Sequence, residues 1–256
     1  ALLAFGDPAL VGHTPKAGEA SPFAALANNC RQGGAMPAGL LRALAPLPDT
    51  ARELNVVATS LGSSTGSLFL GGNATEENLR KQSLDDYRVL YFATHGLLPG
   101  ELRCQAEPGL VLSPPPGVQQ TDTARDGLLE ASEIASLRLN ADLVVLSACN
   151  TAASDGRFGG GDALSGLAEA FFHAGARNML VTHWQVPSAA TAELMSALFT
   201  SLRESNGGSV GESLRRAQNS LFAKGATAHP FFWAAFVVIG DGMGLPPMNA
   251  PQIARR

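Results

Sequence analysis

The sequence lacks the features that mark several large classes of protein. Its 256 residues include only three cysteines, Cys30, Cys104 and Cys149, and no two of them form a C-x-x-C pair. A disulfide framework or a zinc knuckle needs more cysteines at closer spacing. No apolar run reaches the roughly 18–20 residues of a membrane helix, and the first residues, ALLAFGDPAL, include no basic segment typical of a signal peptide. We therefore expect a cytoplasmic protein without a membrane contact.

Charge is also scarce. Only 16% of the residues are charged, the formal net charge is −4, and no run of Lys or Arg exceeds two residues. This balance argues against nucleic acid as a direct partner, and the apolar fraction of 45% excludes a disordered chain. Because no clean linker or internal repeat interrupts the sequence, we expect a single domain over residues 1–256. The chain begins with Ala rather than Met, which predicts that it is part of a longer protein.

Short apolar strands alternate with amphipathic helices along most of the chain. Strands are expected at Leu2–Phe5, Ser67–Leu70, Arg88–Ala93, Asp142–Ala148, Asn178–Thr182 and Phe231–Ile239. Gly6-Asp7-Pro8 should end the first of them, because glycine and proline interrupt regular structure. The alternation predicts an α/β fold, a three-layer sandwich with a mostly parallel central sheet of about six strands.

Capping motifs indicate where several helices begin. Thr50-x-x-Glu53 fits the capping box, in which each side chain accepts a hydrogen bond from the backbone amide of the other residue. Asn73-x-x-Glu76 suggests a second helix start, and Ser188 and Ser209 are expected to cap two later helices. These patterns predict helices after residues 50, 73, 188 and 209.

Three segments show little periodicity. Residues 11–48 are rich in Gly, Pro and Ala, which predicts an irregular surface insertion. Residues 97–130 form a long connection with a possible hairpin between Leu110–Leu112 and Gly127–Leu129, and residues 242–256 form a tail. Loops as long as the 97–130 connection are often functional.

Two of the expected strands end in residues that can carry chemistry. Thr94-His95-Gly96 follows RVLYFA, and Cys149 follows DLVVLSA, which ends in Ser147-Ala148. In an open α/β sheet the ligand crevice lies beyond the carboxyl ends of the strands, so neighbouring parallel strands would place His95 and Cys149 on one rim. A thiolate is a strong nucleophile, and an imidazole can accept its proton. On composition alone, however, a cysteine after a buried strand is more often a small core residue.

Five segments, in the same order along the chain, resemble the CHAT-domain family, a group of caspase-like cysteine peptidase domains of clan CD. They read VLYFATHG, LVVLSACNT, GDALSGLAEAFFHAGA, VTHWQVPSAAT and FFWAAFVVIGDG. The resemblance implies that His95 and Cys149 form a catalytic dyad. It also implies that the backbone amides of Gly96 and Cys149 form the oxyanion hole, a role that needs no reorganisation of the donors.

The resemblance further implies a regulated bacterial endopeptidase that cleaves a partner protein in a stress or defence pathway. No metal or organic cofactor is implied. Members of this family are often fused to tetratricopeptide repeats, so an upstream repeat domain or a regulatory partner is expected. The alternative is a CHAT-like scaffold that has lost catalysis and only binds other proteins.

The segment that lines the substrate pocket departs from the family pattern. Many CHAT domains carry two acids after Trp-x-Val, whereas this sequence has Pro187 and Ser188 there, following Trp184 and Val186. A pocket wall built from these residues is apolar with one hydroxyl group. Since a buried arginine would find no countercharge there, the departure predicts an uncharged residue before the scissile bond.

A different acid could restore a preference for basic residues. Asp155 and Asp162 follow Cys149 closely and could supply a carboxylate to the pocket. Asp162 is equally well placed at the start of a helix, where an acid interacts favourably with the helix dipole. Both readings of the pocket remain open from the sequence.

Overall fold

The computed structural model describes residues 1–12, 35–63, 67–99, 105–116, 123–147, 160–184, 186–206 and 208–240, the first six of α5 by their backbone alone. Its centre is a six-stranded sheet with the order β2-β1-β3-β7-β8-β9. The strands are β1 (Leu2–Pro8), β2 (Leu68–Gly71), β3 (Val89–Ala93), β7 (Leu143–Leu146), β8 (Asn178–Thr182) and β9 (Phe236–Gly240). All neighbouring pairs are parallel except β8 and β9, which confirms the mostly parallel sheet.

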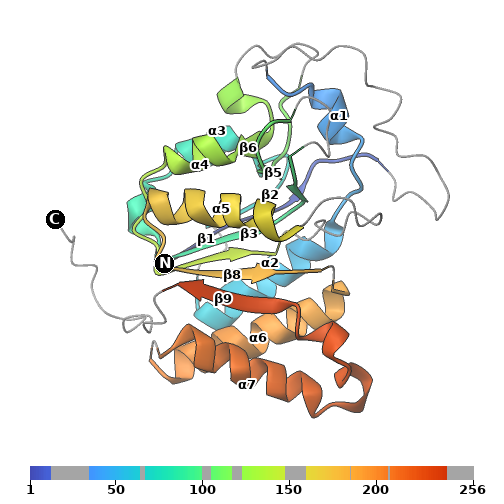
Figure 1. Ribbon diagram of the computed structural model, residues 1–256, viewed down its shortest axis with the longest axis vertical. Helices are drawn as coiled ribbons and strands as arrows, with labels where there is room; N and C mark the ends of the chain where they lie inside the picture. Colours follow the sequence, from blue (N-terminus) through green and yellow to red (C-terminus); the bar gives the residue numbers. More distant parts are fainter. Residues whose placement is uncertain are drawn as a thin grey trace.

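Helices cover both faces of this sheet, as Figure 1 shows. One face carries α2 (Pro48–Leu61), α6 (Ser188–Glu204) and α7 (Val210–Phe222). The opposite face carries α3 (Glu76–Arg80), α4 (Ala131–Ala135) and α5 (Gly160–Ala174). The predicted three-layer α/β sandwich of the caspase-like type is therefore confirmed.

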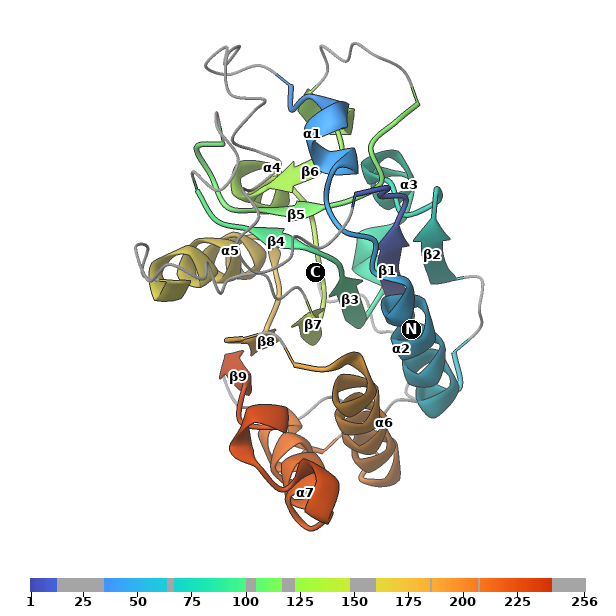
Figure 2. The same ribbon diagram turned by 90° about the vertical axis from the view of Figure 1, so that its right-hand side faces the viewer.

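Several smaller elements complete the described part of the chain. The short helix α1 (Ala38–Arg42) lies beside a second sheet, as Figure 2 shows, and four short 3₁₀ helices connect larger elements. The second sheet contains β4 (Gly96–Leu97), β5 (Gly109–Val111) and β6 (Leu128–Glu130), and the 3₁₀ helices are η3 (Leu84–Asp86), η4 (Thr123–Arg125), η5 (Gly225–Thr227) and η6 (Pro230–Phe232). None of the helices in the described ranges has the length and apolarity that a membrane crossing requires.

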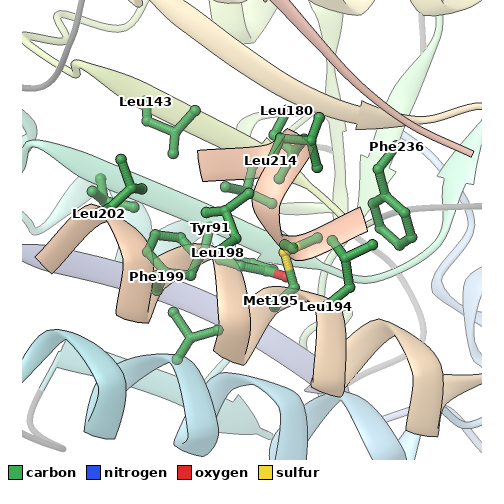
Figure 3. Close-up of a cluster of buried hydrophobic side chains, with 14 of the residues drawn as sticks. Tyr91, Leu143, Leu180, Leu194, Met195, Leu198, Phe199, Leu202, Leu214 and Phe236 are labelled. Carbon is green, nitrogen blue, oxygen red and sulfur yellow. The ribbon is translucent and has the colours of Figure 1, made fainter. Parts of the chain in front are cut away.

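Alternation along each strand divides the core into two layers. Tyr91 and Ala93 of β3 join the hydrophobic cluster beneath α2, α6 and α7, whereas Leu90 and Phe92 join the cluster beneath α3, α4 and α5. Figure 3 shows the first layer, where Tyr91 lies against Phe199 of α6 with ring centroids 6.3 Å apart. Because side chains alternate between faces with a period of two, His95 continues the row of Tyr91 and Ala93 toward the α2 face.

Two predicted strand boundaries are wrong. Strand β1 continues through Gly6-Asp7-Pro8 instead of ending at Phe5, and its pairing with β2 shifts register between Gly6 and Pro8. Asp7 has a positive φ of 48°, so a bulge absorbs the residues that were expected to end the strand. The last strand begins only at Phe236, because Pro230–Phe232 form the 3₁₀ helix η6.

Three predicted helix caps are also wrong. The N-cap of α6 is Pro187, so Ser188 is the first residue of this helix rather than its cap. The N-cap of α2 is Leu47 and Pro48 is its first residue, so Thr50 lies inside the first turn and Glu53 is buried. Proline at this position has the φ angle of a helix and lacks an amide that would need a partner, which moves the start upstream. The N-cap of α3 is Thr75, whose hydroxyl accepts from the amide of Asn78, rather than Asn73. By contrast, Ser209 caps α7 as expected.

The segment 11–48 is less irregular than predicted in its described part. Helix α1 buries Leu40 and Leu41, which form a third apolar cluster with Leu97 and Val111 of the second sheet. The predicted hairpin in the 97–130 connection is confirmed as the antiparallel pair β5 and β6, with Leu110 opposite Leu129. Strand β4 extends this pair directly after His95.

Candidate functional site

A cavity of about 100 Å³ lies at the carboxyl ends of β3, β7 and β8. Its wall is mostly polar and comes from these strand ends and from the first turns of α2 and α6. The lining residues are Leu47, Thr50, Glu53, Thr94, His95, Ser147, Thr182, Val186, Ser188 and Thr191. The carboxyl edge of a parallel sheet is the usual place for a ligand site in α/β folds.

His95 is a buried imidazole with a fixed tautomer. It is 9% exposed, and its Nε2 atom lies 2.8 Å from the carbonyl oxygen of Ala45. A carbonyl oxygen can only accept a hydrogen bond, so Nε2 carries the proton and the lone pair lies on Nδ1. Burial lowers the pKa of His95 below its usual value, and the bond to Ala45 offsets part of this effect. A neutral ring with a free Nδ1 is the form that can act as a general base.

Among the described residues, Glu53 is the single carboxyl group that lines this cavity. It is 2% exposed, and its Oε1 accepts a hydrogen bond from the hydroxyl of Tyr91. The hydroxyl of Ser147 also hydrogen-bonds to the Glu53 side chain. Burial raises the pKa of Glu53 to about 7, and the two hydroxyl groups lower it only in part. Within the described residues, no lysine or arginine forms a salt bridge with Glu53.

Some of the residues predicted for the site lie together. Val186 and Ser188 line the cavity with His95, whereas Trp184 and Pro187 are not among its lining residues. The indole N–H of Trp184 instead donates to the carbonyl of Phe231 over 3.0 Å. Thus only half of the predicted pocket wall borders the cavity.

Other predicted residues cannot be placed in the same way. Gly96 begins β4 immediately after His95, opposite Leu110. Cys149 and Asp155 lie outside the described residues, as do Cys30 and Cys104, and Asp162 is described only as part of the backbone of α5. The assignments of Cys149, Asp155 and Asp162 remain predictions.

Sequence reasoning missed several residues that the fold brings to His95. The carbonyl of Ala45 lies in the segment expected to be irregular, and a backbone atom leaves no mark on the residue type. Glu53 did leave a signal, because it shares the buried face of α2 with Leu54, Val57 and Ala58. An acid inside the apolar stripe of a helix is unusual and often marks a functional position.

Chemically, the arrangement offers a base beside a small polar space. Nδ1 of His95 can accept a proton, and the hydroxyl-rich wall can bind a polar group or water. No group of three or more His, Cys, Asp or Glu side chains in the described ranges is arranged to hold a metal ion. The site is thus suited to acid–base chemistry.

Comparison with known proteins gives two findings. A family model described as "CHAT domain" matches residues 8–241. The chain is also 30% identical over 235 residues to Tetratricopeptide repeat protein 28 of Mus musculus, and 28% identical over 238 residues to the protein of the same name from Homo sapiens. Each match covers 81% of this chain but 9% of the relative, so the chain spans less than a tenth of either relative.

Proposed function

Since the chain belongs to the CHAT-domain family, which is caspase-like, we propose that it is a cysteine endopeptidase with His95 and Cys149 as its dyad. The place of His95 is the observation that carries this proposal. Its imidazole borders a cavity at the end of β3 together with Ser147, which precedes Cys149 by two residues. The substrate is a protein or a peptide, bound where the strands β3, β7 and β8 end.

The reaction proceeds through an acyl-enzyme. Nδ1 of His95 accepts the proton of the Cys149 thiol, and the sulfur attacks the carbonyl carbon of the scissile peptide bond. The backbone amides of Gly96 and Cys149 donate hydrogen bonds to the oxyanion that forms. The imidazolium then gives its proton to the leaving amine, and the C–N bond breaks. Finally, water attacks the thioester with His95 as its base, which releases the acid and restores the thiol.

A non-catalytic scaffold is the second candidate function. It is favoured by the departure at Pro187 and Ser188, where many CHAT domains have acids, and by relatives whose names mention only repeats. A scaffold needs neither a reactive thiol nor a neutral imidazole beside it. Loss of partner binding, rather than of cleavage, would then follow from changes in the domain.

A library of peptides digested by the wild type and by Cys149→Ala separates the two candidates. We expect cleavage at a restricted set of bonds by the wild type and none by the variant, because alanine removes the nucleophile and little volume. Mass spectrometry of the products identifies the bonds. If digests of the two proteins contain the same products, the peptidase proposal is wrong.

Regulation is part of the proposal, as is the setting in the bacterial cytoplasm in a stress or defence pathway. Strand β4 begins directly after His95, so a partner or an upstream repeat domain that repositions the sheet β4-β5-β6 also moves the imidazole. We expect the isolated 256-residue chain to cleave slowly until such a partner is added. Equal activity of the isolated chain and of the longer protein with its partner would contradict this.

A further inference from the structure

Glu53 is a buried acid whose presence the stability of the fold does not explain. It lies on the face of α2 that packs against β1 and β3, next to Leu54 and Val57. Moving a carboxyl group out of water is unfavourable, and the hydrogen-bond partners of Glu53 in the described part of the chain are neutral hydroxyl groups. An apolar residue of similar volume at a position of this kind is usually neutral or stabilising.

The two hydroxyl groups bound to Glu53 come from the two strands that lead into the proposed dyad. Tyr91 belongs to β3 and precedes His95 by four residues, and Ser147 directly follows β7 and precedes Cys149 by two. One carboxyl group therefore connects the middle of β3 and the end of β7 to α2. Ser147 and His95 share the wall of the same cavity with Glu53.

From this geometry we infer that Glu53 is a positioning residue, which fixes the end of β7 through Ser147 and thereby sets the reactivity of Cys149, two residues further along the chain. The inference rests on the proposed function, because it concerns the reactivity of Cys149. Glu53 acts through Ser147 and takes no part in the bond-breaking steps. The acid is retained because it can bind two hydroxyl donors at once, which leucine cannot do.

Alkylation of Cys149 by iodoacetamide tests the inference without a known substrate. All variants carry Cys30→Ala and Cys104→Ala, so that Cys149 is the single thiol, and intact mass spectrometry gives the rate. We expect Glu53→Leu to slow alkylation about tenfold, the loss typical of a buried hydrogen bond to an ionisable group, without lowering the melting temperature. Glu53→Gln should fall between this variant and the wild type, because an amide can accept from Tyr91 and donate to Ser147.

Coupling between Glu53 and Ser147 distinguishes positioning from a general structural role. Ser147→Ala should slow alkylation as well, and the double variant Glu53→Leu/Ser147→Ala should lose little more than Glu53→Leu alone. Glu76 provides the matched control, since it is also 2% exposed but lies in α3 outside the lining of this cavity. Glu76→Gln should alkylate at the wild-type rate.

The outcomes separate this inference from the proposed function. If the folded Glu53→Leu variant alkylates at the wild-type rate, Glu53 is not a positioning residue, whatever the thiol does. If Glu53→Leu fails to fold, Glu53→Gln and Ser147→Ala decide the matter, and wild-type rates in both overturn the inference. A failure of the proposed function appears differently, as a wild-type rate that His95→Ala does not change.

Discussion

The buried ionisable side chains at the two ends of the central sheet have different kinds of partner. At the amino end, Asp142 precedes β7 and is 4% exposed, and it forms salt bridges with Arg88 before β3 and Arg177 before β8. At the carboxyl end, Glu53 and His95 are equally buried but are bound by hydroxyl groups and a backbone carbonyl. The acid at the amino end is thus paired with two arginines, whereas the ionisable groups at the carboxyl end have neutral hydrogen-bond partners.

This difference separates structural from reactive positions. Two guanidinium groups balance the charge of the buried Asp142 side chain, and the shared salt bridges connect the starts of three neighbouring strands. Burial raises the pKa of Glu53 to about 7 and lowers the pKa of His95, and shifted pKa values of this kind are typical of functional sites. The cavity lined by His95, Glu53 and Ser147 lies at the carboxyl end of the sheet, which is why we assign the chemistry to this end.

The largest expected effects come from the proposed dyad. Cys149→Ala should abolish peptide cleavage, and His95→Ala should lower kcat/KM by about 10²–10⁴, because the leaving amine loses its proton donor. Thermal unfolding should change little in either variant, and Cys30→Ala and Cys104→Ala should be nearly silent. If either variant lost as much stability as activity, the distinction between a structural amino end and a reactive carboxyl end of the sheet would be wrong.

Asp142→Ala should produce the reverse pattern at the amino end. Removing the acid leaves Arg88 and Arg177 without their shared partner, which should lower the free energy of unfolding by about 3–5 kcal/mol. The kcat/KM of the folded fraction should stay at the wild-type value. Urea unfolding and peptide assays on one preparation check both quantities. Glu212→Ala, which breaks exposed salt bridges to Arg215 and Arg216, is the control and should hardly affect unfolding.

A smaller effect concerns the residue before the scissile bond. With Val186 and Ser188 in the cavity wall, we expect the wild type to prefer an uncharged residue. Ser188→Asp should shift the preference toward Arg or Lys by about 1–3 kcal/mol, measured as kcat/KM for peptides that differ at this residue. A hundredfold preference of the wild type for Arg would contradict an uncharged pocket and point to Asp155, Asp162 or Glu53.

The smallest effect on activity is expected at Glu76, which tests whether burial alone makes an acid functional. Burial raises the pKa of Glu76 to about 8, and its Oε1 has no hydrogen-bond partner among the described residues. Between pH 5 and pH 8 the folded protein keeps this proton and the unfolded chain loses it, so stability falls as pH rises. The wild type should lose up to about 1.4 kcal/mol per pH unit relative to Glu76→Gln, as urea titrations measure. A pH-independent difference between the two proteins would show that Glu76 does not titrate in this range.

Much of the fold could be predicted because it depends on long-range apolar patterns. Continuous apolar runs such as Asn178–Thr182 belong to strands buried on both faces, and the structure has a strand with these bounds. Predicted helix starts were wrong where a neighbouring residue favoured a different start than the local capping motif. Thr50 and Glu53 match a capping box, but Pro48 starts the helix earlier and turns Glu53 into the core.

From the sequence, the position of the site could be predicted from the ends of the buried strands, but the partners of His95 could not. The position of His95 after a buried strand placed it at the carboxyl edge, where the structure has a cavity. Its hydrogen bond to the Ala45 carbonyl depends on how residues 35–47 fold back, which no residue type records. The contribution of Glu53 required knowing which face of α2 meets β3. Strand periodicity could have placed Ser147 on the same face as His95, since both continue alternating rows.

Labelling with an electrophilic peptide tests the central claim most directly. A peptide that ends in a thiol-reactive ketone is incubated with the wild type and with His95→Ala, and the adduct is mapped by mass spectrometry. We predict one adduct, on Cys149, formed rapidly by the wild type and slowly by His95→Ala. Equal labelling of Cys30, Cys104 and Cys149, with no effect of His95, would contradict a cysteine-peptidase site at the carboxyl end of the sheet.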